Sequence, residues 1–426
     1  MKNGSLMSND VSRAYFYAPA TRNIYVELPE EAGHGPGKCA RLLKSLYGTR
    51  DAATNWSKAY TDILESIGFE VGVSNPCLFK HKSRSITTLV HGDDFLSAAS
   101  DEDLEWMKSE LGKNLEIKTQ KIGRKEKTQQ MTFLGRVITW EESGIKYEAD
   151  PRHAEIVIQS LGLAGGKSAA TPGSTTKLDV RDESASNPLM AGQDATNYRA
   201  VTARLNFLAQ DRTDIQHATK EVSRYMSAPR AGDMEGLKHI GRYLLRRPRA
   251  TYMYKFQAEP SEFTVYSDTD WAGCRSTRKS TSGGIVMHGE HFIKSWSRQQ
   301  NLVSLSSAEA ELYGLVKASS EALGCKAMAH DFGHRKNIRL YADASAALGI
   351  VHRKGLGKVR HIDTNTLWVQ QAACTKRIQY LKVAGTVNPA DALTKHLTEV
   401  LREQHMKKIH VAFDEGRAAA APELCK

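Results

Sequence analysis

The stretch TTLVHGDDFLSAAS (residues 87–100) sets two acids, Asp93 and Asp94, side by side between two short apolar runs. The apolar runs predict two buried strands, and the Gly-Asp between them is a common turn dipeptide. Surface turns are rich in acids, so a plain hairpin turn is one interpretation. In a buried hairpin, two adjacent carboxylates raise each other's pKa unless a cation lies between them. Because Mg²⁺ prefers carboxylate oxygens, this second interpretation requires a third acid elsewhere in the chain.

The whole chain is long and basic. Its 426 residues are enough for two or three domains, each with its own core. Lysine and arginine total 59 against 48 for aspartate and glutamate, which gives a formal net charge of +11. Basic residues outnumber acidic ones in two windows, residues 217–255 and 335–360, and tyrosines are interleaved in the first. Contacts with nucleic-acid phosphates and a solvated helix face explain such windows about equally well.

The six cysteines, at positions 39, 77, 274, 325, 374 and 425, show no CxxC pair and no Cys/His spacing of metal ligands. This pattern argues against a zinc module and against a secreted disulfide framework. No apolar run approaches the length of a membrane span, and the start MKNGSLMSND lacks a hydrophobic signal region. We therefore expect an intracellular protein with no membrane partner, in a cytoplasmic particle, the nucleus or both.

Hydrophobic periodicity predicts an α+β or α/β chain of several domains. Residues 1–142 mix strand patterns with amphipathic helices, and a segment rich in Gly, Ser, Thr, Ala and Pro at about 165–194 is typical of a linker. Helical patterns follow as far as about residue 247. From about residue 258, three strands precede helices that alternate with strands, which predicts a five-stranded mixed sheet. Residues 406–426 have no convincing core pattern, and we expect a disordered tail.

Four acids of this last part lie where strands end or helices begin. They are, in chain order, Asp268, Glu311, Asp343 and Asp391. Side chains at such positions converge from distant segments, and four carboxylates together hold two divalent cations in the arrangement that cuts phosphodiesters. Taken singly, each acid is better explained as a helix cap or a turn residue. Asp270 and Glu309 are close decoys for two of them.

Five ordered motifs span the last part. They are YSDTDWAGCRSTRKSTSGG (266–284), SLSSAEAELYGL (304–315), LYADASAALGI (340–350), VRHIDT (359–364) and NPADALTK (388–395). Together they resemble the ribonuclease H domain of copia-type retrotransposon Pol polyproteins. The resemblance implies a ribonuclease H-like fold and assigns its catalytic, metal-binding roles to Asp268, Glu311, Asp343 and Asp391.

Upstream motifs extend the resemblance to the reverse transcriptase of the same family. They are NDVSRAYFYA (9–18), RLLKSLYGTRDAATNW (41–56), VHGDDF (90–95), FLG (133–135) and RTDIQHATKEVSRYMSAP (212–229). The resemblance implies that Asp10 is the third acid and binds catalytic metal with Asp93 and Asp94. Nucleotide and template contacts are implied for Tyr15, Lys44, Tyr47 and Gly48. Primer contacts are implied for His91, Gly92, Phe133, Leu134 and Gly135.

The resemblance implies three domains. We expect a polymerase palm with a mixed sheet at residues 1–142, a helical thumb and connection at 143–257, and a ribonuclease H-like domain at 258–405. His91 and Gly92 replace the Tyr and Val usual in the family, and only nine residues precede Asp10, where the family's fingers are expected. We therefore expect cleavage of RNA in RNA–DNA hybrids, and weak or no DNA synthesis by this chain alone.

The implied cofactor is Mg²⁺, two ions in each active site, with Mn²⁺ as a substitute. The implied partners are an RNA–DNA hybrid, template RNA and primer, deoxynucleoside triphosphates where the polymerase is active, and other Pol or Gag products. A retroelement relic that binds hybrids without catalysis is the alternative. The basic windows fit either interpretation, whereas four retained acids favour catalysis, because binding alone does not need them.

Overall fold

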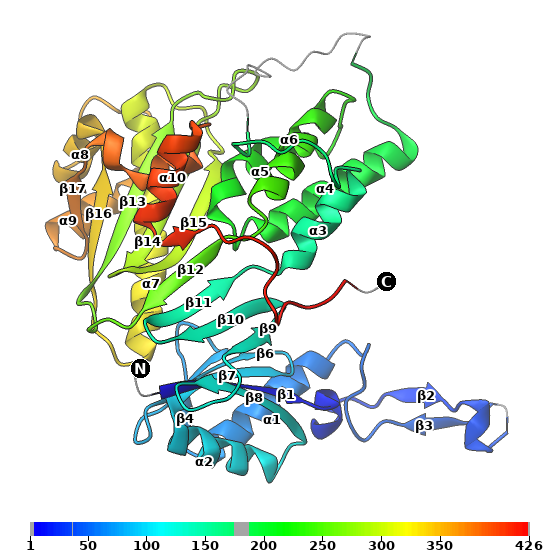
Figure 1. Cartoon of the computed structure of the whole chain (residues 1–426). Helices are drawn as coiled ribbons and strands as arrows, with labels where there is room; N and C mark the ends of the chain where they lie inside the picture. Colours follow the sequence, from blue (N-terminus) through cyan, green and yellow to red (C-terminus); the bar gives the residue numbers. More distant parts are fainter. Residues whose placement is uncertain (1–3, 36, 174–186, 425–426) are drawn as a thin grey trace. The chain divides into compact units, whose positions relative to one another are not determined.

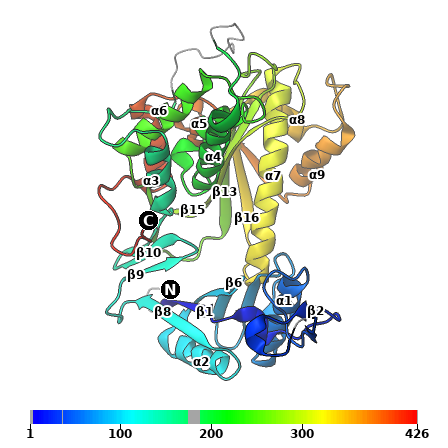
Figure 2. The ribbon, with the colours of Figure 1, turned by 90° about the vertical axis from the view of Figure 1, so that its right-hand side faces the viewer.

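The computed structural model describes residues 4–35, 37–173 and 187–424, and the chain forms two compact units. Unit 1 consists of Met1–Leu134 with Asp331–Gly333, and unit 2 of Gly135–His330 with His334–Lys426. Both units combine helices with sheets, as expected from the sequence (Figures 1 and 2).

Unit 1 is built on a six-stranded sheet with the order β4-β5-β6-β7-β1-β8. Its strands are β1 (Gly4–Val11), β4 (Phe69–Val71), β5 (Leu78–His81), β6 (Ile86–His91), β7 (Asp94–Ser100) and β8 (Ile117–Gly123). Buried and partly exposed residues alternate along β6 and β7, so the opening stretch does form a half-buried hairpin. Helices α1 (Ala52–Ser66) and α2 (Asp101–Gly112) supply Trp56, Leu64, Leu104 and Met107 to the core beneath the sheet.

The expectation of a mixed sheet in residues 1–142 is wrong, because every neighbouring pair in this sheet is antiparallel. The crossover through α2 makes β7 and β8 parallel to each other. However, β1 lies between them and runs opposite to both. The remaining elements of unit 1 are η1 (Ala14–Tyr17), η2 (Glu30–Ala32), β9 (Gln130–Phe133) and the two-stranded sheet of β2 (Tyr25–Glu27) and β3 (Cys39–Arg41).

The first part of unit 2 pairs an antiparallel sheet with a group of helices. The strands are β10 (Arg136–Glu141), β11 (Gly144–Glu148), β12 (Thr251–Lys255) and β18 (Val411–Ala412). The helices are α3 (Pro151–Ser160), α4 (Gly192–Leu208), η3 (Thr213–Ile215), α5 (Gln216–Ser223) and α6 (Asp233–Arg246). They share a core that includes Tyr198, Leu205, Leu237 and Tyr243. Residues 174–186 of the expected linker lie outside the described residues.

The second part of unit 2 confirms the predicted five-stranded mixed sheet, with the order β15-β14-β13-β16-β17. The strands are β13 (Glu262–Asp270), β14 (Thr281–His288), β15 (His291–Gln299), β16 (Asn337–Ala342) and β17 (Gln379–Lys382). The first three pair antiparallel, and β13, β16 and β17 pair parallel. One face packs on α7 (Ser307–Asp331), α8 (Ser345–His352) and α9 (Trp368–Cys374), and α10 (Glu399–Lys408) covers the other (Figure 1). Short turns η4 (Thr364–Leu367), η5 (Gly385–Val387) and η6 (Pro389–Leu393) complete this part.

Residues 406–424 differ from the expected disordered tail. Helix α10 runs to Lys408, and β18 pairs with β12 at the edge of the antiparallel sheet. Ala418 and Ala421 are buried against Val137 of β10. These contacts come from distant segments, so the local sequence carries no periodic pattern that predicts them. Among the described residues, no helix has the length and apolar character needed to cross a membrane, and the five described cysteines are free.

Helix α7 approaches β13 closely because residue 314 is glycine. A Cβ atom added at Gly314 would lie 2.5 Å from Thr269 Oγ1, whereas a Cβ at Gly324 of the same helix meets nothing within 4 Å. We predict that Gly314→Ala lowers the free energy of unfolding by about 1–3 kcal/mol, because the helix must move off the sheet. Gly324→Ala should raise it by about 0.5–1 kcal/mol, because alanine is the better helix former. Urea denaturation measures both, and stabilisation by Gly314→Ala would contradict the close approach.

Candidate active site

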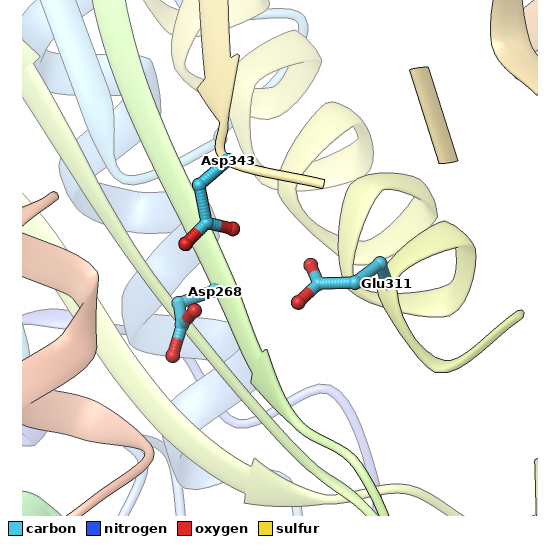
Figure 3. Close-up of side chains that lie close together, drawn as sticks. All are labelled: Asp268, Glu311 and Asp343. Atoms are coloured by element: carbon cyan, nitrogen blue, oxygen red, sulfur yellow. The ribbon is translucent and has the colours of Figure 1, made fainter. Parts of the chain in front are cut away.

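Three carboxylates meet at the edge of the mixed sheet in unit 2. Asp268 lies near the C-terminal end of β13, and Asp343 directly follows β16, which runs parallel to β13. Glu311 reaches the same place from the first turns of α7. Each residue offers an oxygen, and these oxygens all lie within 4.8 Å of one another. Figure 3 shows the three carboxylates turned toward one another.

The start of α7 positions Glu311 and gives Glu309, the neighbouring acid, a separate structural role. The Ser306 hydroxyl accepts a hydrogen bond from the Glu309 backbone N–H (3.2 Å), as the capping-box pattern predicts. The Glu309 carboxylate accepts from the backbone N–H of Leu305 (2.8 Å) and lies 2.8 Å from His361 Nε2. Glu309 is therefore occupied in fixing the helix start, and Glu311 faces the sheet.

The cluster carries more negative charge than its surroundings neutralise. Burial and the neighbouring carboxylates of Asp268 and Asp343 raise the pKa of Glu311 to about 9, against a backbone hydrogen bond from Thr269. Burial and Asp268 also raise the pKa of Asp343. Glu311 Oε2 is buried and has no hydrogen-bond partner among the described residues. A divalent cation fits this set of oxygen donors, because it would supply both the missing partner and the missing positive charge.

Asp391, the fourth predicted acid, lies outside the group of three and is connected to it by Lys395. The Lys395 ammonium lies 3.3 Å from Asp391 Oδ1 and 3.6 Å from Asp268 Oδ2. Burial and Asp268 raise the pKa of Asp391 to about 6, although Lys395 opposes the shift. The Thr394 hydroxyl donates to Asp268 Oδ2. A Cβ at Gly283 of β14 would lie 2.7 Å from Leu393 Cβ, so this glycine lets η6 carry Asp391 close to the sheet.

Sequence reasoning missed Lys395 and Thr394. The motif NPADALTK contains both, and Lys395 stands four residues after Asp391, the spacing of a side-chain ion pair on a helical turn. That spacing was a usable signal, but it does not show that the same lysine also reaches Asp268 on β13.

The raised pKa of Glu311 predicts a pH-dependent stability of the metal-free protein. A carboxyl whose pKa is raised on folding destabilises the fold increasingly as the pH rises from its ordinary value toward the raised one. Glu311→Gln removes this penalty, so in EDTA at pH 8 the variant should be more stable than the wild type by up to about 3 kcal/mol, or several degrees in Tm. The difference should vanish near pH 4, and Mg²⁺ should stabilise the wild type more than the variant.

Glu321 on the same helix supplies a control, because its pKa shift and the expected stability change on substitution have the opposite sign to those of Glu311. Burial favours a raised pKa there, but Lys294 and Lys317 outweigh it and lower the pKa of Glu321. Glu321→Gln should therefore destabilise the protein slightly at neutral pH, by about 0.5–1 kcal/mol. Thermal denaturation from pH 4 to pH 9 measures both variants. A Glu311→Gln protein that is less stable than the wild type across this range would contradict the charge imbalance.

Unit 1 holds the other predicted acids at the β6–β7 hairpin. Asp10 of β1 stands opposite Asp94 of β7 in the strand register, and the Val11 N–H donates to the Asp93 carbonyl (3.0 Å). Burial, Asp93 and Asp10 raise the pKa of Asp94, while His91 lowers it. Among the described residues, only the cluster in unit 2 places three such ligand atoms within 4.8 Å. The structure therefore brings Asp10 and Asp94 near each other in a looser arrangement than that of the cluster in unit 2.

The hairpin turn depends on Gly92. His91 pairs with Asp94, so Gly92 and Asp93 form a two-residue turn, and Gly92 has a positive φ of 64°. A type II′ turn has glycine at its first position, because glycine adopts this positive φ without steric strain. The indole N–H of buried Trp56 donates to the Gly92 carbonyl (2.8 Å) and fixes the turn on α1.

The remaining predicted residues fall into two groups. Tyr15 of η1 and Tyr47 have ring centroids 4.4 Å apart, and the Lys44 ammonium donates to the Tyr17 carbonyl (3.3 Å). Gly48 follows with a positive φ of 89°. The structure thus gathers the residues predicted to contact nucleotide and template. Phe133 ends β9 and is buried, and Leu134 and Gly135 form a turn in which both have positive φ.

Comparison with known proteins adds an independent line of evidence. Residues 2–175 match the family described as reverse transcriptase (RNA-dependent DNA polymerase). The chain is 26% identical over 405 residues to the retrovirus-related Pol polyprotein from transposon TNT 1-94 of Nicotiana tabacum, covering 91% of the chain and 29% of that protein. It is 27% identical over 409 residues to the corresponding polyprotein from transposon RE2 of Arabidopsis thaliana, covering 94% of the chain and 27% of the relative.

A shorter relative is covered more fully. The uncharacterized mitochondrial protein AtMg00810 of Arabidopsis thaliana is 31% identical over 193 residues, which are 44% of this chain and 75% of the relative. The chain spans less than a third of the length of the two polyproteins. The motifs in both units, the reverse transcriptase match and these relatives agree, and the chain belongs to the family of copia-type retrotransposon Pol polyproteins.

Proposed function

We propose that unit 2 hydrolyses the RNA strand of RNA–DNA hybrids at the carboxylate cluster. The observation that carries this proposal is the convergence of Asp268, Glu311 and Asp343 within 4.8 Å, with Glu311 Oε2 buried and unpartnered among the described residues. In this proposal residues 258–405 are a ribonuclease H-like domain, residues 143–257 are the thumb and connection, and the strands and helices before them are the polymerase palm.

The residues of the chain would prepare the site as follows. Asp268, Glu311, Asp343 and Asp391 would hold two Mg²⁺ or Mn²⁺ ions. When bound, such ions supply an activated water and neutralise the leaving oxygen of the phosphodiester. The Thr394 hydroxyl orients the Asp268 carboxylate, and Lys395 holds Asp268 and Asp391 together while offsetting part of their charge. Burial of Asp268 and Glu311 limits the water that competes for their oxygens.

Exposed basic side chains support a polyanionic substrate. Lys354, Lys358 and Arg360 lie in the loop after α8, and all three are exposed. Among the described residues they have no ion-pair partner. These long, solvent-exposed cationic side chains lie in a loop that contains Gly355 and Gly357. They suit contacts with backbone phosphates, and such contacts are largely independent of the nucleic-acid sequence.

A substrate comparison tests the proposal. Purified chain in Mg²⁺ should cut a labelled RNA annealed to DNA, and should leave the same RNA uncut when it is single-stranded or paired with RNA. Hybrid binding without cutting would favour the alternative, a retroelement protein that binds hybrids without catalysis. Cutting of all three substrates alike would overturn the proposed specificity.

A second activity is proposed for unit 1, where Asp10 stands opposite Asp94 in the strand register. Asp10, Asp93 and Asp94 would hold the metal ions of a DNA polymerase, with Tyr15, Lys44, Tyr47 and Gly48 at the nucleotide and template. The primer would lie against His91, Gly92, Phe133, Leu134 and Gly135. Weak or absent DNA synthesis by this chain alone stays a prediction. Extension of a DNA primer on an RNA template, compared with Asp94→Asn, measures it.

A further inference from the structure

A basic pocket lies in unit 2 beside the carboxylate cluster. It is lined by residues 171–173, by His217 of α5, and by Lys395, His396 and Arg402 from η6 onward. The rings of His217 and His396 have centroids 4.6 Å apart. A Cβ on Gly173 would lie 2.2 Å from His396 Cε1, so the wall is closely packed at that point. The pocket therefore has a defined shape set by three separate segments.

Buried polar atoms in this pocket lack partners. Arg402 is only 3% exposed, and its Nε and Nη1 have no hydrogen-bond partner among the described residues. Its Nη2 donates to the Ala170 carbonyl (2.9 Å), and its guanidinium lies 4.4 Å from the centre of the Tyr243 ring. His217 is 8% exposed, and its Nδ1 is also unpartnered within the described part of the chain. Leaving a buried charged donor unpaired is costly, so these atoms point to a ligand that accepts hydrogen bonds.

The charge of the pocket favours an anion. Asp214 also lines it, but its carboxylate is held by both Arg212 Nε (2.9 Å) and Nη2 (2.8 Å) and accepts from the Tyr243 hydroxyl (2.8 Å). Its charge is thus already matched by Arg212. The Lys395 ammonium is shared with Asp391 and Asp268, so Arg402 remains as the cation whose donors, Nε and Nη1, have no partner among the described residues. A guanidinium with such donors suits phosphate oxygens.

We propose that this pocket binds a backbone phosphate of a nucleic acid. Lys395 connects the pocket with the cluster, because it lines the pocket while its ammonium contacts Asp391 and Asp268. The Lys395 side chain is 43% exposed, so this part of the pocket wall lies at the protein surface beside the carboxylates. A phosphate seated here would fix the strand at a set distance from the carboxylates. The identity of that strand as part of an RNA–DNA hybrid rests on the proposed function.

The test measures binding and needs no cleavage. A fluorescent RNA–DNA hybrid is titrated with the full chain by anisotropy in EDTA, and each phosphate in turn is replaced by a neutral methylphosphonate. One linkage should weaken binding to the wild type by about tenfold. Arg402→Gln should weaken binding to the unmodified hybrid by a similar factor and lower the salt slope by about one. At the linkage whose replacement weakens binding, the methylphosphonate and Arg402→Gln together should weaken binding no more than either change alone.

Two variants make the result decisive. Arg377→Gln removes an exposed guanidinium between α9 and β17. Its effect on hybrid affinity should add to the effect of a methylphosphonate at every linkage. His217→Gln should couple to the same linkage as Arg402→Gln, which covers the case in which the arginine variant does not fold. The proposal would be overturned, even where the hybrid is cut, if the effects of both pocket variants on affinity simply added to the effect of the methylphosphonate at every linkage. Coupling at one linkage without any cutting would support the pocket and count against the ribonuclease.

Discussion

Replacing Asp343 by Asn is expected to lower cleavage of the RNA in an RNA–DNA hybrid by at least about 100-fold. The carboxylate oxygens of Asp343, Asp268 and Glu311 lie within 4.8 Å of one another, and an amide brings neither the charge nor a second equivalent oxygen. The variant should fold, because burial and Asp268 raise the pKa of Asp343 and its charge is therefore unfavourable in the metal-free protein. Initial cleavage rates at saturating Mg²⁺ measure the effect.

Two controls separate catalysis from binding. Hybrid affinity measured in EDTA should change less than about threefold, because the substituted group would contact metal ions and not the nucleic acid. Asp363→Asn should keep cleavage, since Asp363 is exposed and its side chain forms no hydrogen bond at the cap of η4. Full cleavage by the Asp343→Asn protein would show that Asp343 is not part of the active site.

Replacing Asp214 by Asn is expected to destabilise unit 2 by about 3–5 kcal/mol. Arg212 and Asp214 form a doubly hydrogen-bonded ion pair whose side chains are 2% and 1% exposed. The Arg212 guanidinium also donates to the carbonyls of Arg247 and Pro248, so it joins η3 to the end of α6. With Asn at 214, an amide N–H would face the guanidinium, and the buried charge of Arg212 would have no counter-ion.

The expected loss has a clear pH dependence. Arg212 holds the pKa of Asp214 below its ordinary value despite burial. A lowered pKa contributes stability that is present above the ordinary value and is lost as the pH falls toward the lowered one, so the gap between wild type and variant should narrow below about pH 4. Asp194→Asn, at an exposed position in the first turn of α4, should cost less than about 1 kcal/mol. Equal losses for both variants in urea denaturation would contradict the account of this pair.

Local features of the sequence predicted much of the fold. The two short apolar runs on either side of Gly92 and Asp93 predicted the β6–β7 hairpin. The capping-box pattern of Ser306 and Glu309 is a second local signal, and it marks the start of α7. These are short-range effects of periodicity and hydrogen bonding. The position of β1 between β7 and β8 depends on pairing with strands far along the chain, and no local pattern predicts it.

The positions of the three clustered acids were predicted better than the side chains that contact them. Strand ends and helix starts indicated where Asp268, Glu311 and Asp343 would meet, because such positions face a common edge of a sheet. Lys395 was missed because its contact with Asp268 joins residues far apart in the chain. The looser arrangement of Asp10 and Asp94 also depends on register, which spacing alone does not give.

The basic residues of 217–255 are explained neither by contacts with nucleic-acid phosphates nor by a solvated helix face, the two interpretations that composition allowed. Arg246 pairs with Glu399, Arg249 with Glu148, and Lys255 with Glu290. Lys220 and Arg224 both pair with Glu221. Much of the positive charge in residues 217–255 therefore holds the chain together. Composition counts charges without partners, so it does not distinguish this case from a nucleic-acid surface.

Cleavage of a hybrid by wild-type chain and by Asp268→Asn, side by side, tests the central claim most directly. Asp268 is 2% exposed, belongs to the group of three and contacts both Thr394 and Lys395. The account predicts that wild type in Mg²⁺ cuts RNA paired to DNA into fragments with 3′-hydroxyl ends, and that Asp268→Asn cuts at least about 100-fold more slowly while remaining folded. Equal cutting by both proteins, or none by folded wild type that binds Mg²⁺ and hybrid, would contradict it.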